Sequence, residues 1–276
     1  VTSTPTKTWA ANGGELKSQG VGAGTNGADF LEFTTNVTLK DFDFRGLKRT
    51  MFFHGDGIKV AFSNCIFDDT CAFMVGLANG NNNTRGITAT VTTTHCDHDK
   101  HYIGVTNGTF NASYPKLINT AVSQYIGIFS SPLGAHVNLD HFLIQMGTGV
   151  PPSSSHLEFV QQGGKGSFTA ANGVFDISPS LKTPYVGGAG WTGVLSFGIQ
   201  STLTDCIFKG VKEVDDRWSR VAASIAYNEG FAPILTNCLL GRGGQGYCIN
   251  SNGGQQRPDA KGNNRDFNSG AVLKRL

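Results

Sequence analysis

The chain has 276 residues, of which 39% are hydrophobic, 15% are charged and 37 are glycine. Because the charged share lies well below the usual value of about 25%, the composition disfavours a helical bundle and favours short strands joined by turns. The formal net charge of +2 disfavours nucleic acid as a partner, since that binding needs clustered lysine and arginine. No membrane span is expected either, because no apolar run approaches about 18 residues.

Seven segments repeat one pattern, in which Asn or Asp at the fifth place is followed three residues later by Phe or Leu. They lie at 37–44, 60–67, 103–110, 136–143, 168–175, 201–208 and 233–240. Their fifth places are Asp41, Asn64, Asn107, Asp140, Asn172, Asp205 and Asn237. The last four gaps are each 32 or 33 residues, which is the mark of a repeat architecture. The segment 87–96 is an alternative repeat, and with that register the match at Asn107 is spurious.

Each repeat predicts a corner between two strands, because Asn and Asp tolerate left-handed backbone and hydrogen-bond their own main chain. A third strand is expected at 51–54, 72–75, 102–105, 126–129, 157–160, 194–197, 223–227 and 246–250. Three short strands per repeat predict an all-β fold, a right-handed parallel β-helix of about eight coils. We expect one domain over 1–276, with 1–30 as an N-terminal capping segment and 250–276 as a polar C-terminal tail.

The corners followed by an apolar residue resemble the asparagine ladder of the pectate-lyase-like β-helix superfamily. Examples are SNCIF at 63–67, TDCIF at 204–208 and TNCLL at 236–240. The resemblance covers about residues 30–250. It implies the β-helix fold, a polysaccharide as partner and a secreted, extracellular or virion-surface location. It singles out no activity, since the superfamily includes lyases, hydrolases, epimerases, phage tailspikes and non-catalytic surface proteins.

The run from His95 to Tyr102 is the densest group of ionisable residues. If it is extended, His95, Asp97, Asp99 and His101 share one side and could bind a divalent cation or divide acid and base roles. Asp97 and Asp99 are the predicted metal ligands, with Ca²⁺ as the expected cation. Lys100 and His101 are predicted to be catalytic and Tyr102 to bind substrate. The alternative is a solvated polar turn.

A second ionisable run covers residues 209–220. A lyase that acts on uronates must neutralise the substrate carboxylate and remove the C5 proton. Asp215 and Asp216 are predicted to hold a cation, Arg217 and Arg220 to be catalytic, and Trp218 to stack on a sugar ring. The alternative is a surface loop with local ion pairs.

These runs favour a polysaccharide lyase that cleaves an acidic, uronate-containing polysaccharide by β-elimination. One alternative is a glycoside hydrolase or tailspike-type depolymerase, in which Asp68 and Asp69 work with Asp56 or Glu158 from other coils. The other is a non-catalytic surface or self-assembling β-helix, because open β-helix ends could support a homo-oligomer.

The cysteines fit the repeat. Cys65, Cys206 and Cys238 share one repeat position and are expected to be small buried residues of a ladder. A disulfide between Cys206 and Cys238 is the alternative if their coils are neighbours.

Overall fold

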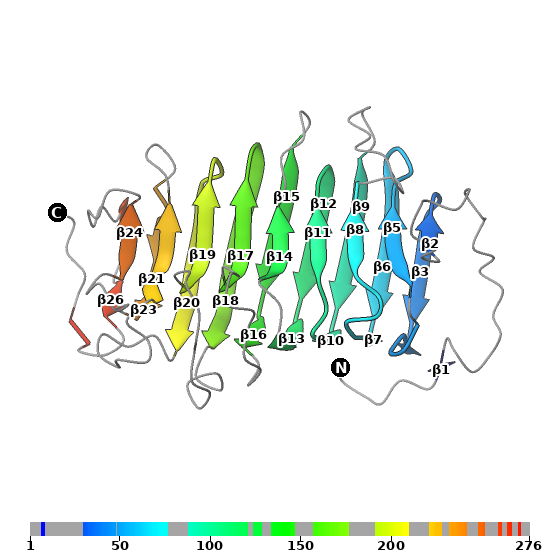
Figure 1. Ribbon diagram of the computed structural model, residues 1–276, viewed down its shortest axis with the longest axis horizontal. Helices are drawn as coiled ribbons and strands as arrows, with labels where there is room; N and C mark the ends of the chain where they lie inside the picture. The colour runs from blue at the N-terminus through cyan, green and yellow to red at the C-terminus, as the bar shows by residue number, and fades with distance from the viewer. Residues whose placement is uncertain are drawn as a thin grey trace.

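The computed structural model is a stack of parallel strands wound into two sheets (Figure 1). It describes residues 7–8, 30–47, 49–76, 88–120, 124–128, 134–146, 157–176, 191–209, 221–227, 232–241, 248–251, 259–260, 264–266 and 270–271. These residues contain no helix, so none of them forms a helix that could span a membrane.

One sheet contains the strands that precede each pair in the repeat. In order along the stack, and all parallel, they are β2 (Phe30–Phe33), β5 (Thr50–Phe53), β8 (Phe73–Val75), β11 (Ile103–Val105), β14 (Gln124–Ile128), β17 (Leu157–Gly163), β19 (Trp191–Phe197), β21 (Val221–Tyr227) and β24 (Ile249–Ser251). The eight expected third strands are confirmed, and β2 adds one more at the N-terminal end.

The other sheet bends at the corners. Before the corners lie β3 (Val37–Lys40), β6 (Ile58–Ser63), β9 (Ala89–Thr94), β12 (Gly108–Ser113), β15 (Ala135–Asp140), β22 (Ile234–Thr236) and β25 (Asp259–Ala260). After them lie β4 (Phe42–Asp43), β7 (Ile66–Phe67), β10 (Asp97–Asp99), β13 (Lys116–Thr120), β16 (Leu143–Met146), β23 (Leu239–Leu240) and β26 (Arg265–Asp266), and β1 (Lys7–Thr8) pairs with β4. Two strands, β18 (Gly166–Asp176) and β20 (Ser201–Lys209), run through the corner. Successive strands pair in parallel, which confirms the expected parallel β-helix.

Eight residues with left-handed backbone mark the corners in the described parts of the chain. They are Asp41, Asn64, His95, Tyr114, His141, Asn172, Asp205 and Asn237, with φ between 50° and 61°. Five of the seven predicted corner residues are therefore confirmed, and the number of coils is the expected one of about eight.

Two predicted corners were wrong. Asn107 lies in the turn between β11 and β12, where its buried Nδ2 donates to the Gly76 carbonyl at 3.4 Å. The segment 87–96 supplies the true corner at His95. The corner lies at His141, one residue after the predicted Asp140. Asp140 pairs with Ala171 across β15 and β18, so His141 lies opposite the corner residue Asn172.

The corner side chains form a ladder of mixed chemistry. Asn64 Nδ2 donates to Asp41 Oδ1 at 2.8 Å, in the manner expected of an Asx ladder. In the middle of the stack, the ring of Tyr114 lies between those of His95 and His141, with centroid distances of 4.5 and 4.8 Å. Ring stacking thus replaces amide hydrogen bonds over three successive coils.

The residue three places after each corner points into the core. These residues are Phe44, Phe67, His98, Leu117, Ile144, Phe175, Phe208 and Leu240, and all are fully buried. Phe44 and Phe67 stack at 5.2 Å, and Phe67 stacks on His98 at 5.0 Å. Burying each apolar member stabilises the fold by about 1.5–3 kcal/mol, so the column of side chains holds the coils together. A histidine occupies the phenylalanine position in the third coil.

The C-terminal tail caps the last corner through Asn264. Its Oδ1 accepts the Cys238 N–H at 2.7 Å, and its Nδ2 donates to the Leu235 carbonyl at 3.1 Å. Most of the predicted capping segment 1–30 and most of the predicted tail 250–276 lie outside the described residues.

Candidate functional site

The strand β10 divides the predicted catalytic run between two faces. His98 is fully buried, so Asp97 and Asp99, its half-buried neighbours in the strand, point to the outer face. Lys100 is exposed and has a left-handed φ of 54°, and His101 is again fully buried. The left-handed residue breaks the alternation, so the expected common face of Asp97, Asp99 and His101 is not formed.

The structure does not support a catalytic role for His101, because its ring lies in the core. Its Nε2 is 2.7 Å from the Cys71 carbonyl oxygen, and its Nδ1 is 2.8 Å from His98 Nδ1. Since a carbonyl only accepts, His101 carries its hydrogen on Nε2 and His98 donates through Nδ1. Burial lowers the pKa of His101 to about 4 and that of His98 well below its usual value, so the pair is neutral.

Two other predicted residues of this run lie away from the aspartates. His95 is part of the corner stack with Tyr114. Tyr102 is half-buried directly before β11, where its ring covers Gly104 beside Met74. A Cβ on Gly104 would lie 3.2 Å from Tyr102 Cε1 and 2.9 Å from Met74 Sδ. Tyr102 therefore belongs to the face of the other sheet, beyond the turn at Lys100.

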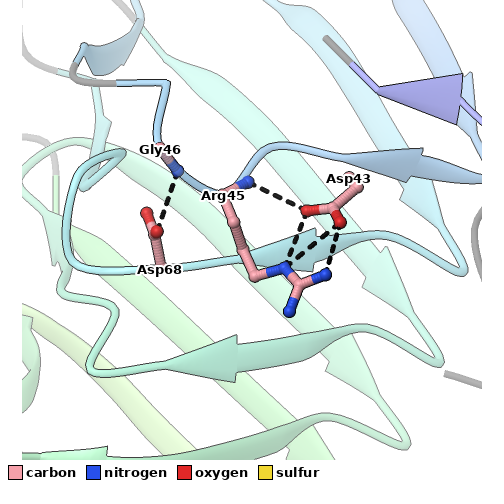
Figure 2. A network of polar contacts seen from close by, with 4 residues as sticks. All are labelled: Asp43, Arg45, Gly46 and Asp68. Carbon is pink, nitrogen blue, oxygen red and sulfur yellow. Dashed lines mark hydrogen bonds and ion pairs between the residues drawn. The ribbon is translucent and has the colours of Figure 1, made fainter. Parts of the chain in front are cut away.

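On the outer face, the aspartates of β10 join charged residues from earlier coils. Asp97 follows Asp43 and Ile66 in the in-register column of β4, β7 and β10. Arg45, next to β4, forms an ion pair with Asp43, in which Nη2 lies 2.6 Å from Oδ2 and Nε lies 3.0 Å from Oδ1 (Figure 2). That hydrogen bond raises the pKa of Arg45, and the fields of Asp68 and Asp99 raise it further. Arg45 therefore lies within electrostatic reach of β10.

Arg45 was not predicted from the sequence. Its side chain is 56% exposed, and with Asp43 it flanks the inward Phe44. The sequence pattern that could have indicated Arg45 is the alternation of charged and aromatic residues in DFDFRG. This alternation places Asp43 and Arg45 on the outer face. We name the set Asp43, Arg45, Asp97, Asp99 and Lys100 the outer charged face.

The carboxylate of Asp68 links two successive coils by hydrogen bonds. Its Oδ1 accepts hydrogen bonds from the Thr70 N–H at 3.0 Å and from the Thr70 hydroxyl, and its Oδ2 accepts the Gly46 N–H at 2.8 Å (Figure 2). Glu158, considered as its catalytic partner, is buried on β17, three strands along the sheet from β8. These two carboxyls therefore do not form the pair that a glycoside hydrolase needs.

The second predicted site, with Asp215, Asp216, Arg217, Trp218 and Arg220, lies outside the described residues. The strand β20 that leads to it ends at Lys209. There Lys209 Nζ is 3.6 Å from Asp176 Oδ2 of the preceding coil. The predicted roles of that loop stay predictions.

The outer charged face offers too few converging oxygen atoms for the predicted calcium ion. Ca²⁺ takes six to eight oxygen ligands. Asp97 and Asp99 lie about 6.8 Å apart along one strand, and the carboxylate of Asp68 is occupied by Gly46 and Thr70. Among the described residues no group of three or more His, Cys, Asp or Glu side chains converges. These residues do not by themselves fit a calcium site, so no step is derived through calcium.

No family model, curated protein or solved structure matches this chain. The resemblance to the pectate-lyase-like superfamily rests on the corner pattern and on the parallel β-helix.

Proposed function

We propose that this chain is a polysaccharide lyase that binds an acidic, uronate-containing polysaccharide on the outer charged face. The observation that carries the proposal is the exposed guanidinium of Arg45. Its contacts to Asp43 use Nε and Nη2, while a guanidinium has five N–H donors in all. The remaining donors suit a substrate carboxylate, since paired N–H groups match the two oxygens of that group.

The proposed reaction is a β-elimination at a uronate residue. The C5 proton passes to a base, and the electrons of the broken C5–H bond form a C4–C5 double bond. The bond between C4 and the glycosidic oxygen breaks, and that oxygen takes a proton from water. Arg45 stabilises the negative charge that develops on the uronate carboxylate. Lys100, which follows Asp99 at the end of β10, is the proposed proton acceptor and acts in its neutral amine form. Asp97 and Asp99 accept hydrogen bonds from sugar hydroxyls and orient the chain.

A second candidate is a non-catalytic structural β-helix. The local pairing of the charged residues favours it, because Asp43 holds Arg45 and Asp68 ties the second coil to Gly46 in the first. If the chain is a structural β-helix, replacing Arg45 lowers the stability of the fold, and there is no enzymatic activity for the replacement to change.

The test compares Arg45→Gln with Asp205→Asn as a matched control. Asp205 is an exposed corner residue on β20, and Asn occupies the corner in other coils. We expect Arg45→Gln to reduce the release of unsaturated oligosaccharides from a polyuronate by about 10²–10³-fold, the usual effect of losing one charge-stabilising donor. Its urea midpoint and the activity of the control should stay at wild-type values. Equal rates in the wild type and Arg45→Gln would remove Arg45 from the reaction. No product from any form, with a lowered urea midpoint in Arg45→Gln, would support the structural candidate.

A further inference from the structure

Four of the six cysteines occupy the place directly after a left-handed corner. Cys65, Cys96, Cys206 and Cys238 follow the corner residues Asn64, His95, Asp205 and Asn237, and all four are fully buried. They form two pairs in successive coils. The residues that follow them pair in register, Ile66 with Asp97 and Ile207 with Leu239. Each cysteine therefore lies directly above or below its partner.

The four side chains share one orientation. Each Sγ lies against the carbonyl oxygen two residues earlier in the chain, at 3.3 Å for Cys65, 3.5 Å for Cys96, 3.3 Å for Cys206 and 3.4 Å for Cys238. The Cys65 N–H also lies 3.5 Å from Cys96 Sγ. In both pairs the later thiol lies against the coil of its partner: Cys96 Sγ is 3.7 Å from the Phe62 carbonyl oxygen, and Cys238 Sγ is 3.5 Å from the Leu203 carbonyl oxygen.

We propose that Cys65–Cys96 and Cys206–Cys238 are two sites of reversible disulfide formation between successive coils. Paired strands lie about 4.8 Å apart, which falls within the Cα separation of about 4.4–6.8 Å that disulfides show. The partners are 31 and 32 residues apart in sequence, so each bond closes one coil onto the next. The backbone pairing of the coils sets this separation without any change of register.

The co-reactant is a low-molecular-weight disulfide. A thiolate of the pair attacks one sulfur of that reagent and expels one small thiol, which leaves a mixed disulfide on the protein. The second cysteine then loses its proton, attacks the protein sulfur and expels the other small thiol. Two protein thiols are oxidised to one disulfide, and one reagent disulfide is reduced to two thiols.

The geometry favours neither sulfur of a pair as the first to attack. All four cysteines share one place after the corner and one side-chain orientation. Because the thiolate is the nucleophile, the first attack comes from whichever thiol of the pair is exposed and deprotonated. Access comes through local opening of the coils or during folding, since the native thiols are buried.

Two cysteines serve as internal controls. Cys71 lies in the turn after β7, where its Sγ contacts the Asp68 carbonyl at 3.3 Å. Cys248 precedes β24, and its Sγ contacts the Leu240 carbonyl at 3.6 Å. Neither occupies the corner position, so neither is expected to cross-link.

The experiment oxidises the reduced full chain with glutathione disulfide in two arms, one on the folded protein and one during refolding from urea. Alkylation in denaturant and peptide mapping then identify the bonds. We expect four of the six thiols to be protected, with Cys65 linked to Cys96 and Cys206 to Cys238. Cys96→Ser should lose the first bond and keep the second, whereas Cys71→Ala should keep both.

The refolding arm separates access from geometry. Bonds that form only during refolding still support the proposal, because the reagent then meets the pairs while the coils are open. Six alkylated thiols in both arms would overturn it. A bond that includes Cys71 or Cys248, or glutathione adducts without internal bonds, would overturn it as well.

Discussion

A buried carboxyl and two buried histidines give folding stability opposite dependences on pH. Burial raises the pKa of Glu158 from 4.5 to about 8, and burial lowers the pKa of His101 from 6.5 to about 4. Glu158 is 1% exposed on β17 and His101 is fully buried beside His98. Because one pKa unit corresponds to about 1.4 kcal/mol, both groups move the free energy of unfolding by several kcal/mol.

The signs follow from proton binding. Folded Glu158 keeps a proton that the unfolded chain loses between pH 4.5 and about 8, so stability falls as pH rises through this window, by about 5 kcal/mol in total. His101 stays neutral in the folded protein, whereas the unfolded chain protonates it below pH 6.5. The free energy of unfolding therefore falls by about 3 kcal/mol as pH decreases from 6.5 to about 4. His98, whose pKa burial also lowers well below its usual value, adds a second slope of the same sign as His101. Between pH 4.5 and 6.5 the two histidines therefore outweigh Glu158, and stability falls by about 1.4 kcal/mol for each unit that the pH decreases. Between pH 6.5 and 8 only Glu158 acts, and stability falls by about 2 kcal/mol.

Urea unfolding of the wild type and Glu158→Gln across this pH range measures the effect. The wild type should be most stable near pH 6.5, lose about 2 kcal/mol by pH 8 and lose about 1.4 kcal/mol for each unit below pH 6.5. The variant should be level above pH 6.5 and lose about 2.8 kcal/mol for each unit below it, because the slopes of the two histidines are no longer opposed. Asp56→Asn removes an exposed carboxyl and should keep the wild-type profile. Parallel profiles of wild type and Glu158→Gln above pH 6.5 would refute the reasoning.

Two further substitutions test the packing of the coils. Phe67→Ala should lower the free energy of unfolding by about 3–5 kcal/mol in urea titrations, because the ring is fully buried between coils; a loss below about 1 kcal/mol would contradict its place in the column. Gly76→Ala should lower Tm more than Gly57→Ala: both glycines have left-handed φ, but only at Gly76 would the new Cβ lie 1.8 Å from the Asn107 carbonyl oxygen. Equal shifts in Tm for the two variants would show that this close approach is absent.

Most of the fold could be predicted because its corners use residues with a local preference for left-handed backbone. Asp41, Asn64 and Asn172 carry that preference in their own side chains. Tyr114 does not, since a bulky residue with positive φ is an outlier in isolation. Its ring stacks between those of His95 and His141, which come from other coils, and this stacking holds the conformation. A pattern search limited to Asn and Asp could not find those corners.

The candidate site could be predicted only in part, for a similar reason. Alternation in a strand correctly places Asp97 and Asp99 on one face, but it fails at Lys100, whose left-handed φ sends His101 into the core. Arg45 was not predicted as a site residue because the sequence places only one partner carboxylate, that of Asp43, next to it. The other carboxylates that act on it, Asp68 and Asp99, come from later coils. Contacts between coils depend on the register, which sequence alone left open between residues 64 and 140.

The most direct test of the proposed lyase is the ultraviolet absorbance of a polyuronate solution after the full chain is added, recorded with calcium and with a chelator. Elimination creates a C4–C5 double bond conjugated with the uronate carboxylate, and hydrolysis does not. The proposal predicts a steady rise in absorbance that depends on Arg45. New reducing ends without such a rise, or no cleavage of any uronate polysaccharide, would contradict it.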